Sequence, residues 1–156
     1  MNQRAHIYFI ISVLALLTGA CDPNRVYDRN EPVNPDGWMP RDPKVFQVDI
    51  SDTISIYNLY ISLRHTNDYP FSNIYFFIRT TFPDGQLYRD TVEYLLTDPS
   101  GQWLGKGLGK IKDTRYPFRK GIHLPEKGTY IFSIEQAMRE KYLKGIHDVG
   151  LRIERY

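Results

Sequence analysis

The chain has 156 residues, which is enough for one domain and too few for two domains of ordinary size. Its 20 Lys and Arg residues against 18 Asp and Glu residues give a net charge of +2, so the broad basic surface of a nucleic-acid-binding protein is not expected. A single cysteine excludes an intramolecular disulfide and a multi-cysteine metal cluster. Aromatic residues make up 14% of the chain, and this high share favours β structure.

The first twenty residues have the pattern of an export signal. Arg4 precedes an apolar run over residues 7–20, IYFIISVLALLTGA. A helix over this run reaches only about 21 Å, which is short of the roughly 30 Å hydrocarbon core of a bilayer. Residues 1–20 are therefore predicted to be a signal peptide rather than a transmembrane helix.

The apolar run ends as Leu17-Thr18-Gly19-Ala20-Cys21, which resembles a bacterial lipobox, with Thr18 where the commonest version has Leu. This resemblance implies cleavage before Cys21 and acylation of its thiol and of the new amino terminus. The alternative is a chance cysteine at the end of a membrane-anchoring or otherwise cleaved segment. Cys21 is thus the predicted lipidation site, and the lipid bilayer is a predicted partner.

Residues 22–43 carry five of the ten prolines and show no apolar period. Together with the acylated Cys21 they are predicted to form a linker over residues 21–43. In an extended conformation of about 3.1 Å per residue, this linker would span up to roughly 70 Å. Trp38 is expected to mark where the chain docks onto the body, and a chain from about Gly37 onward is expected to fold alone.

Beyond Pro43 the sequence alternates between apolar and polar residues, as half-buried strands do. Alternation is clearest in residues 56–65, 73–82, 129–134 and 148–156, and further strands are expected at residues 45–50 and 86–97 and around residues 108–114 and 118–124. Pro83-Asp84-Gly85 predicts a hairpin turn between two of these strands. About seven or eight antiparallel strands indicate one all-β domain over residues 44–156, a single β-sandwich of jelly-roll-like or immunoglobulin-like type.

Residues 135–144, EQAMREKYLK, are predicted to form at most one short helix, with Gly145 placed to cap its C-terminus. The bonds Tyr69-Pro70 and Tyr116-Pro117 are candidates for cis peptides in tight turns.

The sequence offers little support for catalysis. It contains no G-x-S-x-G nucleophile elbow, and the glycine cluster at residues 105–110 fails as a phosphate loop because Leu104 and Ile111 stand at required Gly and Ser/Thr positions. His65, His123 and His147 are isolated in sequence and make no metal-binding pair. Carboxylate pairs across strands stay open, but no enzyme activity, metal or other cofactor is expected.

Three aromatic residues, Tyr60, Tyr75 and Phe77, fall on the face opposite the regular apolar face of their strands. They predict either a sugar-stacking platform or a protein-docking patch. The alternative is that residues 135–144 and neighbouring loops cover them.

Six groups of residues carry a further resemblance when they are taken in order: YNL with LR at residues 57–64, YPFSN at 69–73, DTVEY at 90–94, GQWLGKG at 101–107, QAMR at 136–139 and GIHDVGLRIE at 145–154. With the preceding lipobox they resemble the gliding-motility lipoprotein family GldH, from about Trp38 to Tyr156. The resemblance implies an envelope lipoprotein that is needed for gliding motility and is tied to type IX secretion. It carries over no catalytic residue.

The sequence therefore predicts a lipid-anchored, non-enzymatic adaptor of the gliding and secretion machinery, held at the cell membrane, with the outer membrane favoured. The alternative is a carbohydrate-binding lipoprotein of the cell envelope. Its expected partners are other envelope proteins, not nucleic acid, and the oligomeric state and the face of the membrane stay open. The candidate interaction residues are Trp38, Tyr69, Tyr75, Phe77, Trp103, Gly105 and Gly107.

Overall fold

The computed structural model describes residues 22–107 and 109–156, and the expected signal peptide and Cys21 lie outside them. The described residues form eight strands and no helix. The strands are β1 (Arg25–Pro32), β2 (Lys44–Ile50), β3 (Tyr57–Thr66), β4 (Asn73–Thr81), β5 (Leu87–Leu95), β6 (Ile111–Ile122), β7 (Gly128–Gln136) and β8 (Ile146–Arg155). The predicted all-β fold is confirmed.

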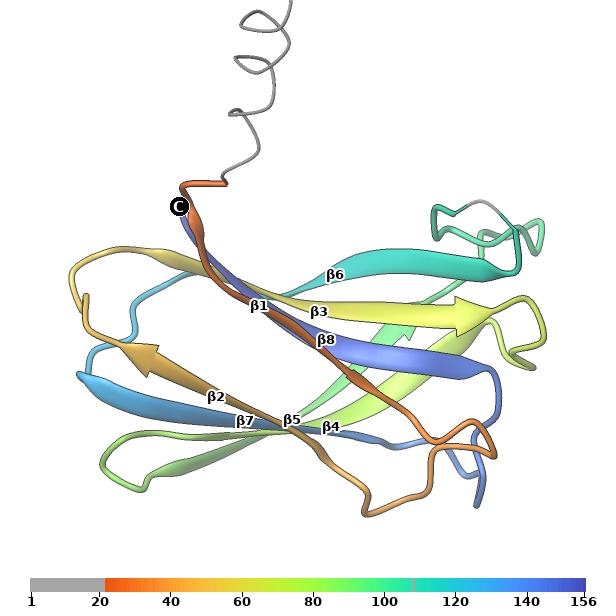
Figure 1. Ribbon diagram of the computed structural model, residues 1–156, viewed down its shortest axis with the longest axis horizontal. Coiled ribbons are helices and arrows are strands. Elements are labelled where there is room, and N and C mark those ends of the chain that lie inside the picture. Colours follow the sequence, from red (N-terminus) through yellow and green to blue (C-terminus); the bar gives the residue numbers. More distant parts are fainter. Residues whose placement is uncertain (1–21, 108) are drawn as a thin grey trace, which may run out of the picture.

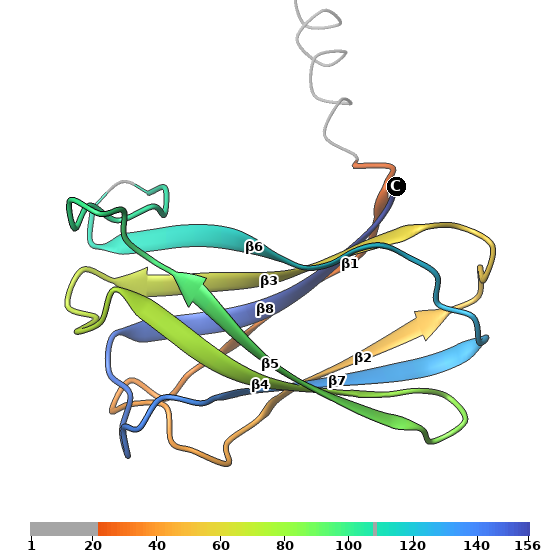
Figure 2. The same cartoon turned by 180° about the vertical axis from the view of Figure 1, so that it is seen from behind.

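The strands build two four-stranded antiparallel sheets that face each other (Figure 1). One sheet has the order β1-β8-β3-β6 and the other has the order β2-β7-β4-β5. This alternation of strands between two sheets is the jelly roll, which decides between the two types of sandwich predicted from the sequence. The view from behind shows the same two layers, with the C-terminus beside the start of β1 (Figure 2).

Alternating residues of both sheets fill the core between the layers. Ile74, Phe76 and Ile78 of β4 are fully buried, whereas Tyr75 and Phe77 between them are exposed. The apolar faces predicted for the other clear strands are buried in the same way, through Tyr57, Leu59, Ile61, Leu63, Tyr130, Phe132, Ile134, Val149, Leu151 and Ile153. The predicted hairpin joins β4 to β5, and there Gly85 adopts a φ of 89°.

The prediction of a linker is wrong for residues 25–32, because they form strand β1. This strand pairs antiparallel with β8, from Arg25 opposite Glu154 to Pro32 opposite Asp148. β1 lies at the edge of its sheet and most of its side chains are exposed, so it lacks the apolar alternation that marks the inner strands. The body of the protein therefore begins within a few residues of Cys21.

Trp38 docks onto the body as predicted. Its side chain is fully buried beside Phe76, its indole N–H donates to the carbonyl of Asp42 at 2.7 Å, and its backbone bonds to Leu143. Residues 33–43 are therefore part of the folded body.

Two further predictions are corrected. Residues 111–122 form the single strand β6 instead of two strands, and Pro117 is tolerated within it because β6 lies at a sheet edge. Residues 135–144 form no helix, in agreement with the expectation of at most one short helix, since Glu135 and Gln136 continue β7 and pair with Phe77 and Phe76 of β4. The described chain contains no cis peptide bond, so the two X-Pro bonds singled out from the sequence are trans.

Candidate functional site

The outer face of the β2-β7-β4-β5 sheet carries exposed apolar side chains from three strands. In the hydrogen-bonded register, residues opposite each other share a face, and this places Leu95 and Leu87 of β5 on the same side as Tyr75 and Phe77 of β4. Val45 of β2 joins them through its pairing with Ser133, which lies opposite Arg79. We call this set the apolar outer face: Val45, Tyr75, Phe77, Leu87 and Leu95, which are 36–60% exposed.

Polar groups on this face are paired with one another. Asn73 donates a hydrogen bond to Glu93 at 2.6 Å, and this bond, followed by one from the hydroxyl of Tyr75, lowers the pKa of Glu93. The bond to Glu93 in turn raises the pKa of Tyr75. Arg79 forms an ion pair with Glu135, whose side chain is 7% exposed. These carboxylates are held by neighbours, so the face presents apolar surface between fixed charges.

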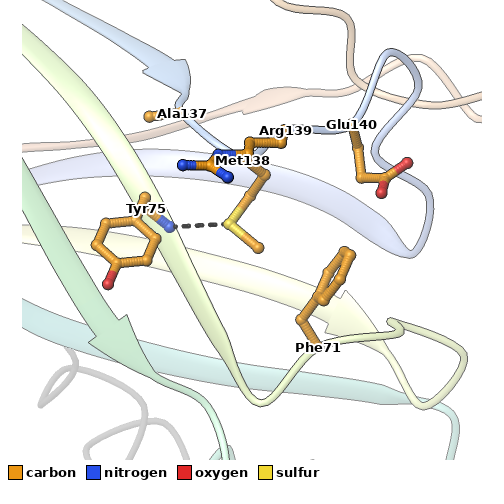
Figure 3. A pocket seen from close by; sticks show the side chains of 6 residues that line it. All are labelled: Phe71, Tyr75, Ala137, Met138, Arg139 and Glu140. Carbon is orange, nitrogen blue, oxygen red and sulfur yellow. Dashed lines mark hydrogen bonds between the residues drawn. The ribbon is translucent and has the colours of Figure 1, made fainter.

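A groove of about 480 Å³ adjoins the apolar outer face (Figure 3). Its walls are Phe71, Tyr75, Ala137 and Met138, and the exposed Arg139 and Glu140 complete the lining. The sulfur of Met138 accepts a hydrogen bond from the backbone N–H of Tyr75 at 3.4 Å. An apolar wall with charged residues at its border suits the side chain of a partner more than a reacting group.

Two of the predicted interaction residues are buried. Trp38 is fully buried, and Tyr69 is 3% exposed with its hydroxyl donating to the carbonyl of Asn73 at 2.9 Å. Burial raises the pKa of Tyr69 well above its ordinary value of 10.0. Both side chains hold loops against the core, which leaves Tyr75 and Phe77 as the exposed aromatic pair.

Trp103, Gly105 and Gly107 lie in the long loop between β5 and β6. The Trp103 ring is half-buried, with its centroid 4.6 Å from that of the buried His65. A Cβ atom on Gly105 would lie 2.6 Å from the Thr114 hydroxyl, and one on Gly107 would lie 2.3 Å from the Ile111 carbonyl oxygen. Both glycines thus let the loop lie close against β6.

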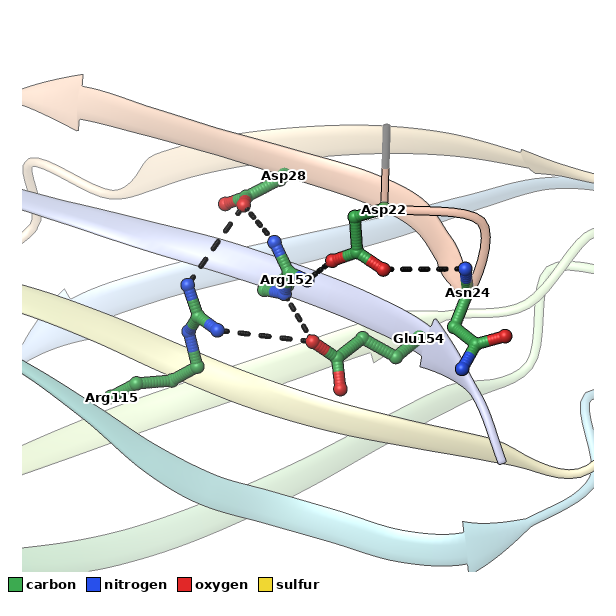
Figure 4. Close-up of polar contacts among 6 residues, drawn as sticks. All are labelled: Asp22, Asn24, Asp28, Arg115, Arg152 and Glu154. Carbon is green, nitrogen blue, oxygen red and sulfur yellow. Dashed lines mark hydrogen bonds and ion pairs between the residues drawn. The ribbon is translucent and has the colours of Figure 1, made fainter. Parts of the chain in front are cut away.

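The sequence did not reveal an arginine-centred cluster on the outer face of the other sheet (Figure 4). Arg152 is 8% exposed and forms ion pairs with Asp22, Asp28 and Glu154, while Arg115 lies 4.0 Å and 3.8 Å from the last two carboxylates. Burial acts to lower the pKa of Arg152, but hydrogen bonds to the three carboxylates outweigh burial and raise this pKa. The hydrogen bond between Arg152 and Asp22 lowers the pKa of Asp22.

In the sequence, only the position of Arg152 between Leu151 and Ile153 indicates that its side chain faces outward. Neighbouring residues of a strand point to opposite faces, and these two are buried in the core. The Arg152 partner Asp28, which is 124 residues away in sequence, follows from the strand order alone.

Residues 22–107 and 109–156 contain no group of three His, Cys, Asp or Glu side chains that would hold a metal ion. The same part of the chain has no helix that is long and apolar enough to cross a membrane. His65 is fully buried and its Nε2 atom has no hydrogen-bond partner, but aromatic rings and a backbone carbonyl surround it.

The family model described as GldH lipoprotein matches residues 25–153 of the chain. The chain belongs to the GldH lipoprotein family. It is 37% identical over 160 aligned residues to the gliding motility lipoprotein GldH homolog of Christiangramia forsetii, covering 98% of both chains. It is also 34% identical to the gliding motility lipoprotein GldH of Flavobacterium johnsoniae, covering 93% of this chain and 94% of the relative.

The match of the GldH family begins at Arg25, the first residue of β1, which agrees with β1 being part of the body. Membership makes the chain a lipid-anchored protein of the cell envelope from a gliding-motility family. Among solved structures, a fructofuranosidase from Schwanniomyces occidentalis has a TM-score of 0.38 at 8% identity, covering 86% of this chain and 35% of the enzyme. A similarity this low says nothing about function.

Proposed function

We propose that this GldH-family lipoprotein is a non-enzymatic adaptor of the gliding and type IX secretion machinery. Acylated Cys21 holds it at a membrane, with the outer membrane as the favoured location, and the apolar outer face binds another protein of the assembly. The observation that carries this proposal is the group of five exposed apolar side chains on one face of one sheet. Exposed apolar side chains gathered on one face of a folded protein are typical of a docking site for another protein.

The composition of the apolar outer face favours a protein partner over a glycan. A sugar-binding platform presents aromatic rings spaced for successive sugar units, whereas here Tyr75 and Phe77 share the face with the aliphatic Val45, Leu87 and Leu95. The apolar groups extend over three strands, β2, β4 and β5. A broad mixed patch of this kind matches the apolar centre of a protein interface.

The test is a charge placed in the middle of the apolar outer face. Phe77→Glu is expected to lower the melting temperature only slightly, because Phe77 is 46% exposed although Glu135 lies opposite it, but to abolish rescue of colony spreading and protein secretion in a strain that lacks the gene. Leu104→Glu is the matched control, since Leu104 is 51% exposed in the β5–β6 loop. Full rescue by a well-expressed Phe77→Glu protein would overturn the adaptor proposal.

The same pair of variants tests the glycan alternative. Purified envelope polysaccharide is titrated into the folded wild-type protein and into both variants. We expect no binding by any of them. Saturable binding that Phe77→Glu removes and Leu104→Glu retains would show that the apolar outer face takes carbohydrate instead of protein.

A further inference from the structure

Very few residues separate Cys21 from the folded body. Asp22, the next residue, pairs with Arg152, and the carbonyl of Asn24 accepts a hydrogen bond from the backbone N–H of Arg155 at 2.8 Å. Strand β1 begins at Arg25. Even fully extended, residues 22–24 would reach only about 10 Å. Acyl chains on Cys21 therefore bring this end of the sandwich to the membrane surface.

Three exposed apolar side chains lie at this same end: Ile54, Ile56 and Tyr156, which are 87%, 38% and 89% exposed. Polar contacts connect them to the residues after Cys21. The backbone N–H of Tyr156 donates to the carbonyl of Ile56 at 2.8 Å, and Arg155, which bonds to Asn24, lies 3.7 Å from Asp52. The carboxylate of Asp52 accepts a hydrogen bond from the backbone N–H of Ile54 at 3.0 Å.

Two of the three side chains also share a face with the Arg152 cluster. Arg152, Glu154 and Tyr156 follow one another at a spacing of two along the end of β8, and Asn58 lies opposite Glu154 in the register. Continuing the same alternation by two residues places Ile56 beside Tyr156. Ile56, Tyr156, the C-terminus and the residue that follows Cys21 therefore gather on one side of the sandwich, with Ile54 at the same end, and Figures 1 and 2 show the C-terminus beside the start of β1.

We propose that Ile54, Ile56 and Tyr156, which we call the anchor-side patch, insert into the interfacial layer of the membrane that holds the acyl chains of Cys21. The inference rests on acylation of Cys21. Transfer of aliphatic side chains from water into this layer is favourable in free energy. Tyrosine is enriched at membrane interfaces because its ring is apolar and its hydroxyl is polar.

The acyl chains already supply membrane affinity, so the patch adds orientation. It turns the β1-β8-β3-β6 sheet toward the membrane. The apolar outer face, which lies on the opposite sheet, then points away from the lipid and toward a partner.

The test uses the full acylated lipoprotein in vesicles of phosphatidylethanolamine and phosphatidylglycerol. Ile54→Cys introduces a thiol that accepts an environment-sensitive fluorophore, since the sulfur of Cys21 is occupied by lipid and the chain has no other cysteine. Gln47→Cys, carrying the same fluorophore, is the control, because Gln47 is exposed on the outer face of β2 in the opposite sheet. Both positions are exposed, so neither substitution is expected to disturb folding.

We expect nitroxide-bearing lipids to remove most of the fluorescence at position 54 and little at position 47. Protein that floats with the vesicles but shows equal quenching at both positions would overturn the anchor-side patch while leaving the lipid anchor and the adaptor function intact. Protein that does not float would show that Cys21 is not acylated, and this result would contradict both the lipid anchor and the anchor-side patch.

Discussion

At the scale of single residues, Arg152 does the most to hold the start of the chain in place. It is nearly buried and bonds to carboxylates from β1, from β8 and from the segment before β1. Removal of the guanidinium leaves Asp28 and Glu154 with the more distant Arg115 as their nearest cation. Hydrogen bonds to charged groups are worth about 1.5–3 kcal/mol each in such settings.

We therefore expect Arg152→Met to lower the free energy of unfolding by about 2 kcal/mol or more, measured by denaturant titration. Arg115→Met is the matched control. Its side chain is 45% exposed and lies 3.8 Å or more from the same carboxylates, so its cost is expected to stay below about 1 kcal/mol. Equal losses for the two variants would show that Arg152 has no special role.

His65 makes stability depend on pH. Burial lowers the pKa of His65 below its ordinary value of 6.5, the hydrogen bond to the carbonyl of Thr66 opposes this, and nearby Lys112 lowers it further. The folded state therefore binds fewer protons than the unfolded chain once the pH falls below about 6.5. The contribution of neutral His65 to the free energy of unfolding is complete above that pH and is lost as the pH falls toward the pKa of His65 in the folded state.

We expect the urea midpoint of the wild-type protein to drop between pH 7.5 and pH 5, and the drop to be smaller in His65→Phe. The Phe ring keeps the packing against Trp103 and Tyr69 but does not titrate. His123→Gln, at an exposed position, is expected to behave like the wild type. A drop in His65→Phe as large as in the wild type would assign the pH dependence to other groups.

At the scale of elements, the strands that can be predicted from the sequence are those with one buried and one exposed face. β4 shows this best, because Ile74, Phe76 and Ile78 alternate with Tyr75 and Phe77. The same alternation is enough to predict the exposed aromatic pair of the candidate site. Strand β1 has no such pattern, since it is held at an edge by backbone bonds to β8.

Residues 135–144 have the most helix-forming composition of the body, yet they form no helix. Their composition favours a helix locally, but Glu135 and Gln136 pair with β4, and the amide of Gln136 bonds to the carbonyls of Trp38 and Glu140. Tertiary bonds thus override local propensity. The Arg152 cluster could not be predicted from the sequence either, because long-range strand pairing brings its residues together.

The placement of β1 in the sheet leads to a prediction about truncation. A chain that begins at Gly37 lacks β1 and uncovers the edge of β8, whose middle residues are all buried. We expect this chain to lose cooperative thermal unfolding, followed by far-UV circular dichroism, whereas a chain that begins at Asp22 retains it. Equal melting temperatures would contradict a structural role for β1 and would restore residues 22–36 as a linker.

At the scale of the whole molecule, the jelly roll separates two tasks between its two sheets. The β1-β8-β3-β6 sheet carries the start of the chain and the anchor-side patch, and the β2-β7-β4-β5 sheet carries the apolar outer face. Because the body follows Cys21 so closely, a long flexible tether does not set the reach of the protein. Under the proposed function, the partner therefore comes to the membrane surface and binds the face that points away from the lipid.

The most direct test of this arrangement is photo-crosslinking in living cells from position 77, followed by mass spectrometry. A photoreactive phenylalanine analogue replaces Phe77 in one strain and Leu104 in another, at matched expression. We expect a discrete crosslink from position 77 to another protein of the envelope, and no such product from position 104. Crosslinks of equal strength from both positions, or none from position 77, would contradict an adaptor that binds its partner through the apolar outer face.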